Sequence, residues 1–320
     1  MSLDLLDQIR SSCARVAQNA RHVRLEYDSL RKLAGELSRK HTSPTVLDPA
    51  HHFSGSDADT LAFILTLDAI NFGSGWFPHL HKPDGLSGYF TISTALTRHF
   101  HESGPWMAEA LAELDATRCH ETFAQPQTSE IEELMLLFAR ALNHLGRFLL
   151  DGYGGRFEGP IEAAAGSAAN LVRILGEMPL YQDVARYDDF EVFFYKRAQL
   201  TAADLSVAFG GRGAGRFDDL DRLTLFADNL VPHVLRCEGV LSYDEGLAAR
   251  IDREDLIEPG SREEVEIRAV GVHAVERLVT EIKAAGGSTT AQELDYRLWS
   301  WGQSPSIKSR PRHRTRCTYY

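Results

Sequence analysis

Apolar residues recur three and four positions apart along most of this chain, and this helical period constrains the fold more than any other feature. Leu30, Leu33 and Leu37 are one clear example. Alternation with a period of two is nearly absent, and the best strand candidate, Glu191–Tyr195, is short and could be the entrance to a helix. The sequence therefore predicts an all-α fold.

Capping signals locate the ends of several helices. Ser2 is expected to cap the first helix, with Asp4 in its first turn, and Ser56 with Asp59 resembles a capping box ahead of the apolar run 61–70. Further helices are expected near 86–101, 105–116, 129–149, 160–176, 201–209, 217–227, 230–238, 261–285 and 289–301.

The glycine-rich segment Gly210–Gly215 is the loop that most resembles a phosphate-binding site. A dinucleotide fingerprint needs a preceding strand, and a P-loop needs Gly-Lys-Ser/Thr. Here both flanking segments, 201–209 and 217–226, are helix-like, so a hairpin between two helices is favoured. With no internal repeat or linker, we expect residues 1–320 to form a single domain. This domain would be one helical unit, or a unit of two lobes around a cleft. Residues 1–50 would form N-terminal helices, and residues 308–320 a basic tail.

Charge and cysteine content exclude several classes of protein. The net charge is −11, and because residues 308–320 carry five Lys/Arg and no Asp or Glu, residues 1–307 carry −16. This disfavours nucleic acid and anionic membranes as partners, and no apolar run approaches the 18 residues of a membrane span. The four scattered cysteines and the acidic N-terminus suggest a cytoplasmic protein. Neither a metal nor a cofactor is expected, and the oligomeric state is open.

Two segments early in the chain combine polar groups with aromatic rings. His52 and Phe53 precede a predicted helix, and Asp68, Asn71 and Phe72 precede a glycine turn. Asp68 and Asn71 would share one helix face. They are candidate contacts for a ligand, although each segment taken alone is more often a cap or a turn.

Two further segments place a carboxylate in an apolar or aromatic setting. Asp228 lies among Phe226, Leu230 and Val231, where it is either the N-cap of the next helix or an ionised group in a dry pocket, with Lys196 as a partner. Asp295 and Trp299, four residues apart on one helix face, could form a wall for a flat heterocycle with N–H donors.

The order and spacing of these segments resemble the queuosine salvage family, whose members are queuosine 5′-phosphate N-glycosylase/hydrolases that release the base queuine. The resemblance spans about residues 50–320. It rests on His52-Phe53, Asn71-Phe72-Gly73, Lys196-Arg197-Ala198-Gln199-Leu200, Phe226-Ala227-Asp228, Leu294–Trp299, His313-Arg314-Thr315-Arg316 and Tyr319-Tyr320.

The resemblance implies a helical fold related to helix-hairpin-helix DNA glycosylases, in which the catalytic Asp follows a glycine hairpin. Asp228 occupies the matching position, and Lys196 is similar to the Lys nucleophile of bifunctional glycosylases, although a simple hydrolase needs only water. The implied partners are queuosine 5′-phosphate and queuine. The tail, through His313 and Arg314, or Lys196 would contact the phosphate. The family often has His where this chain has Arg312.

This function makes chemical demands that the residues can meet. Departure of the base leaves positive charge on the ribose, which Asp228 could stabilise. Queuine is a 7-deazaguanine and has no N7 to protonate. Its edge must therefore be held by polar groups, and its faces by aromatic rings. Two alternatives stay open: a glycosylase acting on DNA or RNA, and a helical binding module without catalysis. A strong dependence of activity on salt concentration would indicate the nucleic-acid glycosylase. Normal turnover by Asp228→Asn would indicate the binding module.

Overall fold

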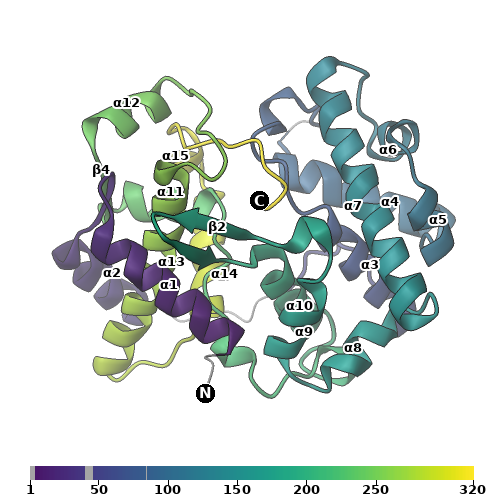
Figure 1. Cartoon of the computed structure of the whole chain (residues 1–320), viewed down its shortest axis with the longest axis horizontal. Helices are drawn as coiled ribbons and strands as arrows, with labels where there is room; N and C mark the ends of the chain where they lie inside the picture. The colour runs from purple at the N-terminus through teal and green to yellow at the C-terminus, as the bar shows by residue number, and fades with distance from the viewer. Residues whose placement is uncertain (1–3, 40–45, 84) are drawn as a thin grey trace. The chain divides into compact units, whose positions relative to one another are not determined.

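The computed structural model describes residues 4–39, 46–83 and 85–320. Helices predominate in these residues, and the strands that they contain form two antiparallel pairs, so the predicted all-α class is confirmed (Figure 1). The chain divides into two compact units. The first unit comprises Met1–Thr45, Asp183–Lys196 and Asp221–Arg316, and the second comprises Val46–Gln182, Arg197–Leu220 and Cys317–Tyr320.

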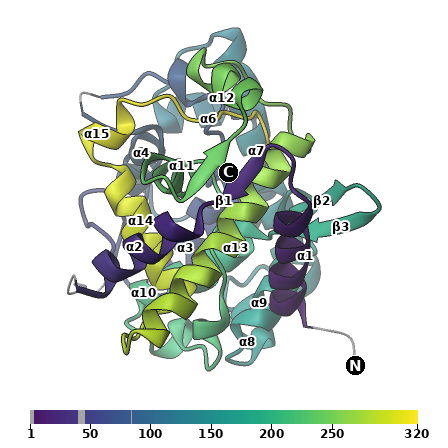
Figure 2. The same cartoon turned by 90° about the vertical axis from the view of Figure 1, so that its left-hand side faces the viewer.

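The first unit is built around the long helix α13, Arg262–Ala284, against which α1, α2, α11 and α14 pack (Figure 2). Strand β1 pairs with β4 in the register Val23↔Tyr243, and β2 pairs with β3 in the register Val184↔Phe193. Its other elements are α1 Leu5–Asn19, β1 Val23–Leu25, α2 Tyr27–Arg39, β2 Val184–Tyr187, β3 Phe190–Phe193, α11 Leu230–Cys237, β4 Leu241–Tyr243, α12 Glu245–Asp252, α14 Ala291–Gly302 and α15 Pro305–Lys308.

Helix α13 also anchors β1 through a buried carboxylate. The side chain of Glu266, which is fully buried, accepts hydrogen bonds from the main-chain N–H groups of Arg21, His22 and Val23 and from the hydroxyl of Tyr187. A buried charge is tolerated when it is hydrogen-bonded in this way. The contact therefore holds three separate parts of the first unit together.

The second unit is organised around α7, Ser129–Tyr153, on which α3, α5, α6 and α8 pack. Gly146 allows α5 to approach α7 closely, because a Cβ there would lie 2.4 Å from the main-chain nitrogen of Ala112 in α5. The remaining elements are α3 Asp57–Ala69, η1 Phe77–His79, α4 Gly88–Ser103, α5 Ala108–Glu113, α6 Ala116–Phe123, α8 Glu158–Ala164, α9 Ala168–Leu175, η2 Pro179–Tyr181, α10 Lys196–Ala208 and η3 Gly213–Gly215.

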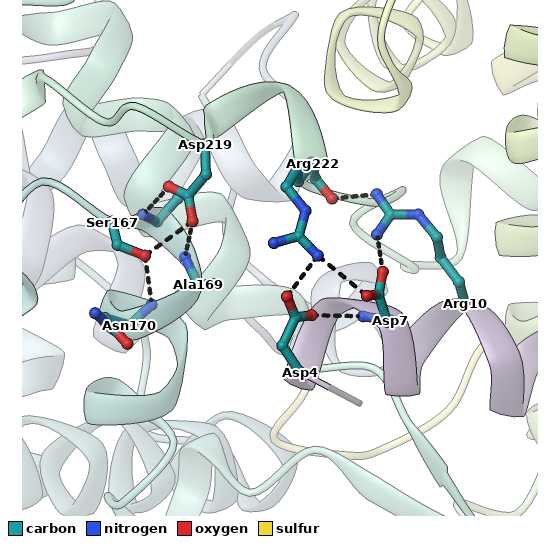
Figure 3. A network of polar contacts seen from close by, with 9 residues as sticks. Asp4, Asp7, Arg10, Ser167, Ala169, Asn170, Asp219 and Arg222 are labelled. Atoms are coloured by element: carbon teal, nitrogen blue, oxygen red, sulfur yellow. Dashed lines mark hydrogen bonds and ion pairs between the residues drawn. The ribbon is translucent and has the colours of Figure 1, made fainter. Parts of the chain in front are cut away.

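Acidic side chains cap two helix starts, as Figure 3 shows. In the second unit Asp219 accepts hydrogen bonds from the hydroxyl of Ser167 at 2.8 Å and from the N–H of Ala169 at 3.2 Å, at the beginning of α9. In the first unit Asp4 caps α1 and accepts a hydrogen bond from the N–H of Asp7 at 3.0 Å. The guanidinium of Arg222 contacts the carboxylates of Asp4 and Asp7. The predicted cap, Ser2, lies outside the described residues.

Several expected elements differ from the structure. The helix expected over 217–227 is wrong: after the short turn η4, Leu220–Arg222, the chain is not helical until α11. Contacts from distant side chains to the main chain of residues 226 and 227 override the local helical pattern there. The helix expected over 160–176 is split into α8 and α9 at Ala165, which has a φ of 51°. The strand candidate at 191–195 corresponds to β3, which spans Phe190–Phe193.

No helix in the described ranges combines the length and the apolar character that crossing a membrane requires.

Candidate active site

Asp228 lies two residues before the first residue of α11, next to the N-cap residue Asn229, and its carboxylate caps the first turn of that helix. Its Oδ1 accepts hydrogen bonds from the main-chain N–H groups of Leu230 at 2.8 Å and Val231 at 3.0 Å. These are the donors that a capping residue satisfies at a helix start. Oδ2 takes part in neither bond, so capping uses only one side of the carboxylate.

Hydrogen bonds to three other segments fix the chain around Asp228. The N–H of Phe226 donates to Oδ1 of Asp295 at 3.1 Å, and Nε of Arg268 donates to the carbonyl of Ala227 at 3.0 Å. On the other side, Nδ2 of Asn229 donates to the carbonyl of His313 at 3.2 Å. The position of Asp228 is thus set by α13, α14 and the C-terminal segment.

The charge state of Asp228 depends on opposing influences. Burial raises its pKa above the ordinary value of 3.8, whereas the nearby charge of Lys196, the two capping N–H groups and the charge of Arg312 lower it. Burial is the largest of these effects. Two cations near one carboxylate favour its ionised form, which is the form that can stabilise a cation.

Lys196 is the first residue of α10 and is only 6% exposed. Its main-chain N–H donates to Oδ2 of Asp183 at 3.1 Å. The preceding residue, Tyr195, has a φ of 47°, a left-handed conformation that non-glycine residues seldom adopt. A tight, strained turn at the end of β3 therefore delivers Lys196 toward Asp228.

Arg312 was not among the candidates from sequence. Burial lowers the pKa of its guanidinium, and the charge of Asp228 raises it. Within residues 4–39, 46–83 and 85–320, this guanidinium takes part in no hydrogen bond or ion pair. In the structure, side chains 313, 315 and 317 are buried whereas 312, 314 and 316 are partly exposed, and the sequence alone does not reveal this pattern.

The two candidates from the tail serve other contacts. His313 is 2% exposed, and burial, with the charge of Arg268 next, lowers its pKa to about 3, so it is neutral near pH 7. The guanidinium of Arg314 donates to the carbonyl of Glu254 at 2.7 Å and lies 3.7 Å from its carboxylate. The main chain of Arg314 forms a bridge with Leu256.

The two predicted residues of α14 lie one turn apart in the same helix, as expected. Asp295 is 5% exposed and holds the segment before Asp228 through Phe226. Trp299 is partly exposed. Among the candidates of the first unit, contacts therefore link Asp228, Lys196, Asp295 and His313 to one region.

In the second unit, His52 and Phe53 belong to an aromatic cluster. Nε2 of His52 lies 2.8 Å from the hydroxyl of Tyr89, and Nδ1 lies 3.1 Å from the carbonyl of Asp48. Burial lowers the pKa of His52, which favours the neutral ring. The partly exposed ring of Phe53 lies 5.4 Å from that of Phe100.

Asp68 is fully buried, and Phe72 is 1% exposed. Because α3 ends at Ala69, Asn71 is not on a helix face with Asp68, which corrects that expectation; its N–H donates to the carbonyl of Asp68 at 3.3 Å instead. Burial, followed by the charges of Asp204 and Asp68, raises the pKa of Tyr89. Asp68 is thus part of a buried polar cluster.

Arg197 is a second residue that the sequence did not single out, because it appeared only within the motif at Lys196. Its guanidinium donates to the carbonyls of Ala69 and Leu180 and lies 5.0 Å from the ring centre of Phe72 and 4.3 Å from that of Tyr181. Phe72 therefore packs on a buried cation.

Two other features bear on ligand binding. In the described part of the chain, no group of three or more His, Cys, Asp or Glu side chains could hold a metal ion. An open pocket of about 500 Å³ in the second unit is lined by residues of α7 and the turn before η2, among them His144, Arg147 and Tyr153, and by none of the candidates.

Comparison with known proteins agrees with the resemblance. The family model described as "Queuosine salvage protein" matches residues 51–320. A protein of Sphaerobacter thermophilus named queuosine 5′-phosphate N-glycosylase/hydrolase is 34% identical over 98% of this chain and 97% of its own length. Proteins of the same name from Dictyostelium discoideum and Mus musculus are 30% and 28% identical, over 98% and 97% of this chain and 99% and 98% of their own. The chain belongs to the queuosine salvage protein family.

Proposed function

We propose that this protein hydrolyses the N-glycosidic bond of queuosine 5′-phosphate, releasing queuine and ribose 5-phosphate. Water supplies the hydroxyl group to the anomeric carbon, and the base leaves with the bonding electrons and a proton. The printed names of relatives that match this chain over nearly its full length support this reaction.

The observation that carries the proposal is the carboxylate of Asp228, with one oxygen used in capping α11 and two cations, Lys196 and Arg312, close to it. As the base departs, positive charge grows at the anomeric carbon. A carboxylate about 4 Å away, at an effective dielectric constant near 20, stabilises this charge by about 4 kcal/mol, equivalent to about a thousandfold in rate.

Lys196 and Arg312 have complementary parts in this scheme. Both charges oppose the effect of burial, which raises the pKa of Asp228, and so favour its ionised form. Arg312 is also the cation of the tail that is proposed to meet the substrate phosphate, because Arg314 is engaged with Glu254 and His313 is neutral. Charge-assisted contacts of this type are strong in a closed site.

Recognition of the base stays a prediction for the remaining candidates. Asp295 and Trp299 in the first unit supply an acceptor and a partly exposed ring. In the second unit Phe53 has a partly exposed ring, whereas the buried ring of Phe72 is better suited to supporting Arg197. His52, Asp68 and Asn71 are the proposed polar contacts.

The reaction can be tested by incubating the protein with queuosine 5′-phosphate in H₂¹⁸O and analysing the products by mass spectrometry. Free queuine and ribose 5-phosphate with one ¹⁸O are expected. Asp228→Asn serves as the matched control, since it keeps the shape and the capping oxygen. Absence of queuine with the parent protein would refute the proposed reaction.

The phosphate contact is tested by comparing kcat/KM for queuosine 5′-phosphate and queuosine. The parent protein is expected to prefer the phosphate, and Arg312→Ala to lose most of this preference. Lys196→Ala and His313→Ala complete the series, and Arg314→Ala is the neighbouring control that should retain the preference. Equal values for both substrates in the parent protein would show that no phosphate site exists.

A further inference from the structure

A fully buried ion pair lies beneath the candidate catalytic residues of the first unit. Arg268 in α13 is 1% exposed and Asp183, just before β2, is 3% exposed. Nη1 of Arg268 lies 2.9 Å from Oδ1 of Asp183, and Nη2 lies 2.6 Å from Oδ2, so the pair is bidentate. Glu264, one turn earlier in α13, lies 3.5 Å from the same guanidinium.

Each member of the pair also holds the main chain next to one of the two residues. Nε of Arg268 donates to the carbonyl of Ala227, which immediately precedes Asp228. Oδ2 of Asp183 accepts from the N–H of Lys196 itself. One rigid fork therefore ties the main chain at Asp228 to the main chain at Lys196.

The same pair supports the strained turn that leads into α10. The carbonyl of Asp183 accepts hydrogen bonds from the N–H groups of Phe194 at 3.0 Å and Tyr195 at 3.3 Å. The guanidinium of Arg268 lies 3.9 Å from the ring centre of Phe194. Strained conformations such as that of Tyr195 persist only where the surroundings determine them, and here Asp183 supplies three of the contacts.

We infer that Asp183 and Arg268 are positioning residues, which set the separation and orientation of Asp228 and Lys196 for the reaction. The inference rests on the function proposed above. Buried ion pairs are weak contributors to net stability, because desolvation offsets their attraction. A geometric task explains why this pair is bidentate and why its remaining donor and acceptor both end on main-chain atoms beside Asp228 and Lys196.

The test uses Asp183→Asn and Arg268→Lys in the full chain. Asn keeps an oxygen for the N–H of Lys196 but presents N–H groups to the guanidinium, and Lys cannot form the bidentate fork. Glu266→Gln is the matched control: Glu266 is equally buried, lies two residues before Arg268 in α13 and holds β1 rather than the candidate site. Thermal unfolding is measured for all three.

We expect kcat for queuosine 5′-phosphate to fall at least tenfold in Asp183→Asn and Arg268→Lys, with KM changed less than threefold. Glu266→Gln should lose comparable stability and keep the kcat of the parent protein. If kcat stays within threefold of the parent in both variants, or falls equally in Glu266→Gln, the positioning role is overturned.

A pH profile gives a readout that a merely structural role would not change. Lys196 and Arg312 lower the pKa of Asp228, and the capping N–H groups act in the same direction. If Lys196 shifts away, the pKa of Asp228 rises, and the acid limb of kcat/KM should move to higher pH in Asp183→Asn. An unchanged acid limb would contradict the inference.

A double variant separates this inference from the assignment of Asp228. With Asp228→Asn already present, adding Asp183→Asn should lower kcat by less than a further threefold, because the effects of residues that act as a unit are not additive. A further loss as large as in the parent background overturns positioning through Asp228. Near-normal turnover by Asp228→Asn alone instead overturns the catalytic role of Asp228, and with it this inference.

Discussion

At the scale of single residues, Asp228 serves two purposes that are usually alternatives. It satisfies the first N–H groups of α11, as an N-cap does, and it lies near two cations in a largely desolvated place. The two uses are compatible because capping involves Oδ1 alone. A carboxylate fixed by a helix start needs no reorganisation when charge develops next to it, which is the basis of electrostatic preorganisation.

Asp228→Asn should lower the single-turnover rate on queuosine 5′-phosphate by about a thousandfold, since it removes the charge but keeps the capping oxygen. Rapid-quench kinetics will measure this. Asp228→Ala, which also removes the cap, should lose about 1 kcal/mol of stability in addition. A loss under tenfold in the Asn variant would exclude Asp228 as the main stabilising charge.

The raised pKa of Asp228 also has a consequence for stability. Protonation is easier in the folded chain than in the unfolded one, so this group favours folding below its ordinary pKa of 3.8 and loses that contribution as pH rises through the raised value. At pH 7 the Asn variant should therefore unfold at the same or a higher temperature than the parent, and the difference should shrink at pH 4. A lower Tm at pH 7 would contradict this.

His313 predicts the opposite pH dependence. Its pKa falls from 6.5 to about 3 on folding, so the contribution of its neutral form is complete above pH 6.5 and is lost as pH falls toward 3. One such group changes the free energy of unfolding by about 1.4 kcal/mol per pH unit in this window. When the free energy of unfolding, measured with denaturant, is plotted against pH between 4 and 7, the slope should be shallower for His313→Gln than for the parent. Equal slopes for the variant and the parent would contradict this assignment.

At the scale of elements, the sequence predicts helices well where apolar spacing and a cap agree. Helix α14 is capped by Thr290, which forms a capping box with Glu293, and α13 is capped by Ser261, so both helices begin close to the expected positions. The prediction fails for 217–227, where Asp295 and Arg268 bind the main chain of residues 226 and 227. Such contacts come from residues more than 40 positions away, so a local pattern cannot reveal them.

The packing of α5 on α7 depends on one glycine, and a second glycine in α7 provides its control. Gly146→Ala should destabilise the protein by about 1–3 kcal/mol, because the new Cβ would lie 2.5 Å from the carbonyl of Ala108 and force α5 away. Gly152→Ala meets no atom within 4 Å and should stabilise by about 0.5–1 kcal/mol through lower entropy of the unfolded chain. Urea unfolding of both variants measures the difference. Equal effects would show that α7 tolerates a side chain at this contact.

At the scale of the whole molecule, each unit is assembled from segments that are far apart in the sequence. The short segment Asp183–Lys196 brings Lys196 into the first unit, next to residues more than 30 positions later. The sequence indicated Asp228 from its apolar neighbours and Lys196 as its possible charge partner, and the family motif includes both. It did not indicate Arg312 or the pair Asp183–Arg268, because their importance arises only from contacts between these distant segments.

The charge of the whole chain predicts a free nucleotide rather than a nucleic acid as substrate. With a net charge of −11, and −16 on residues 1–307, the protein has little to neutralise a run of phosphates. The plot of log kcat/KM for queuosine 5′-phosphate against log salt should have a slope no steeper than about −1, and queuosine, which has no phosphate, should give a flatter line. A nucleic-acid glycosylase that contacts six phosphates would give a slope near −5 with its polymeric substrate. Excess tRNA should not inhibit turnover of the nucleotide; inhibition that is relieved steeply by salt would favour a site for nucleic acid instead.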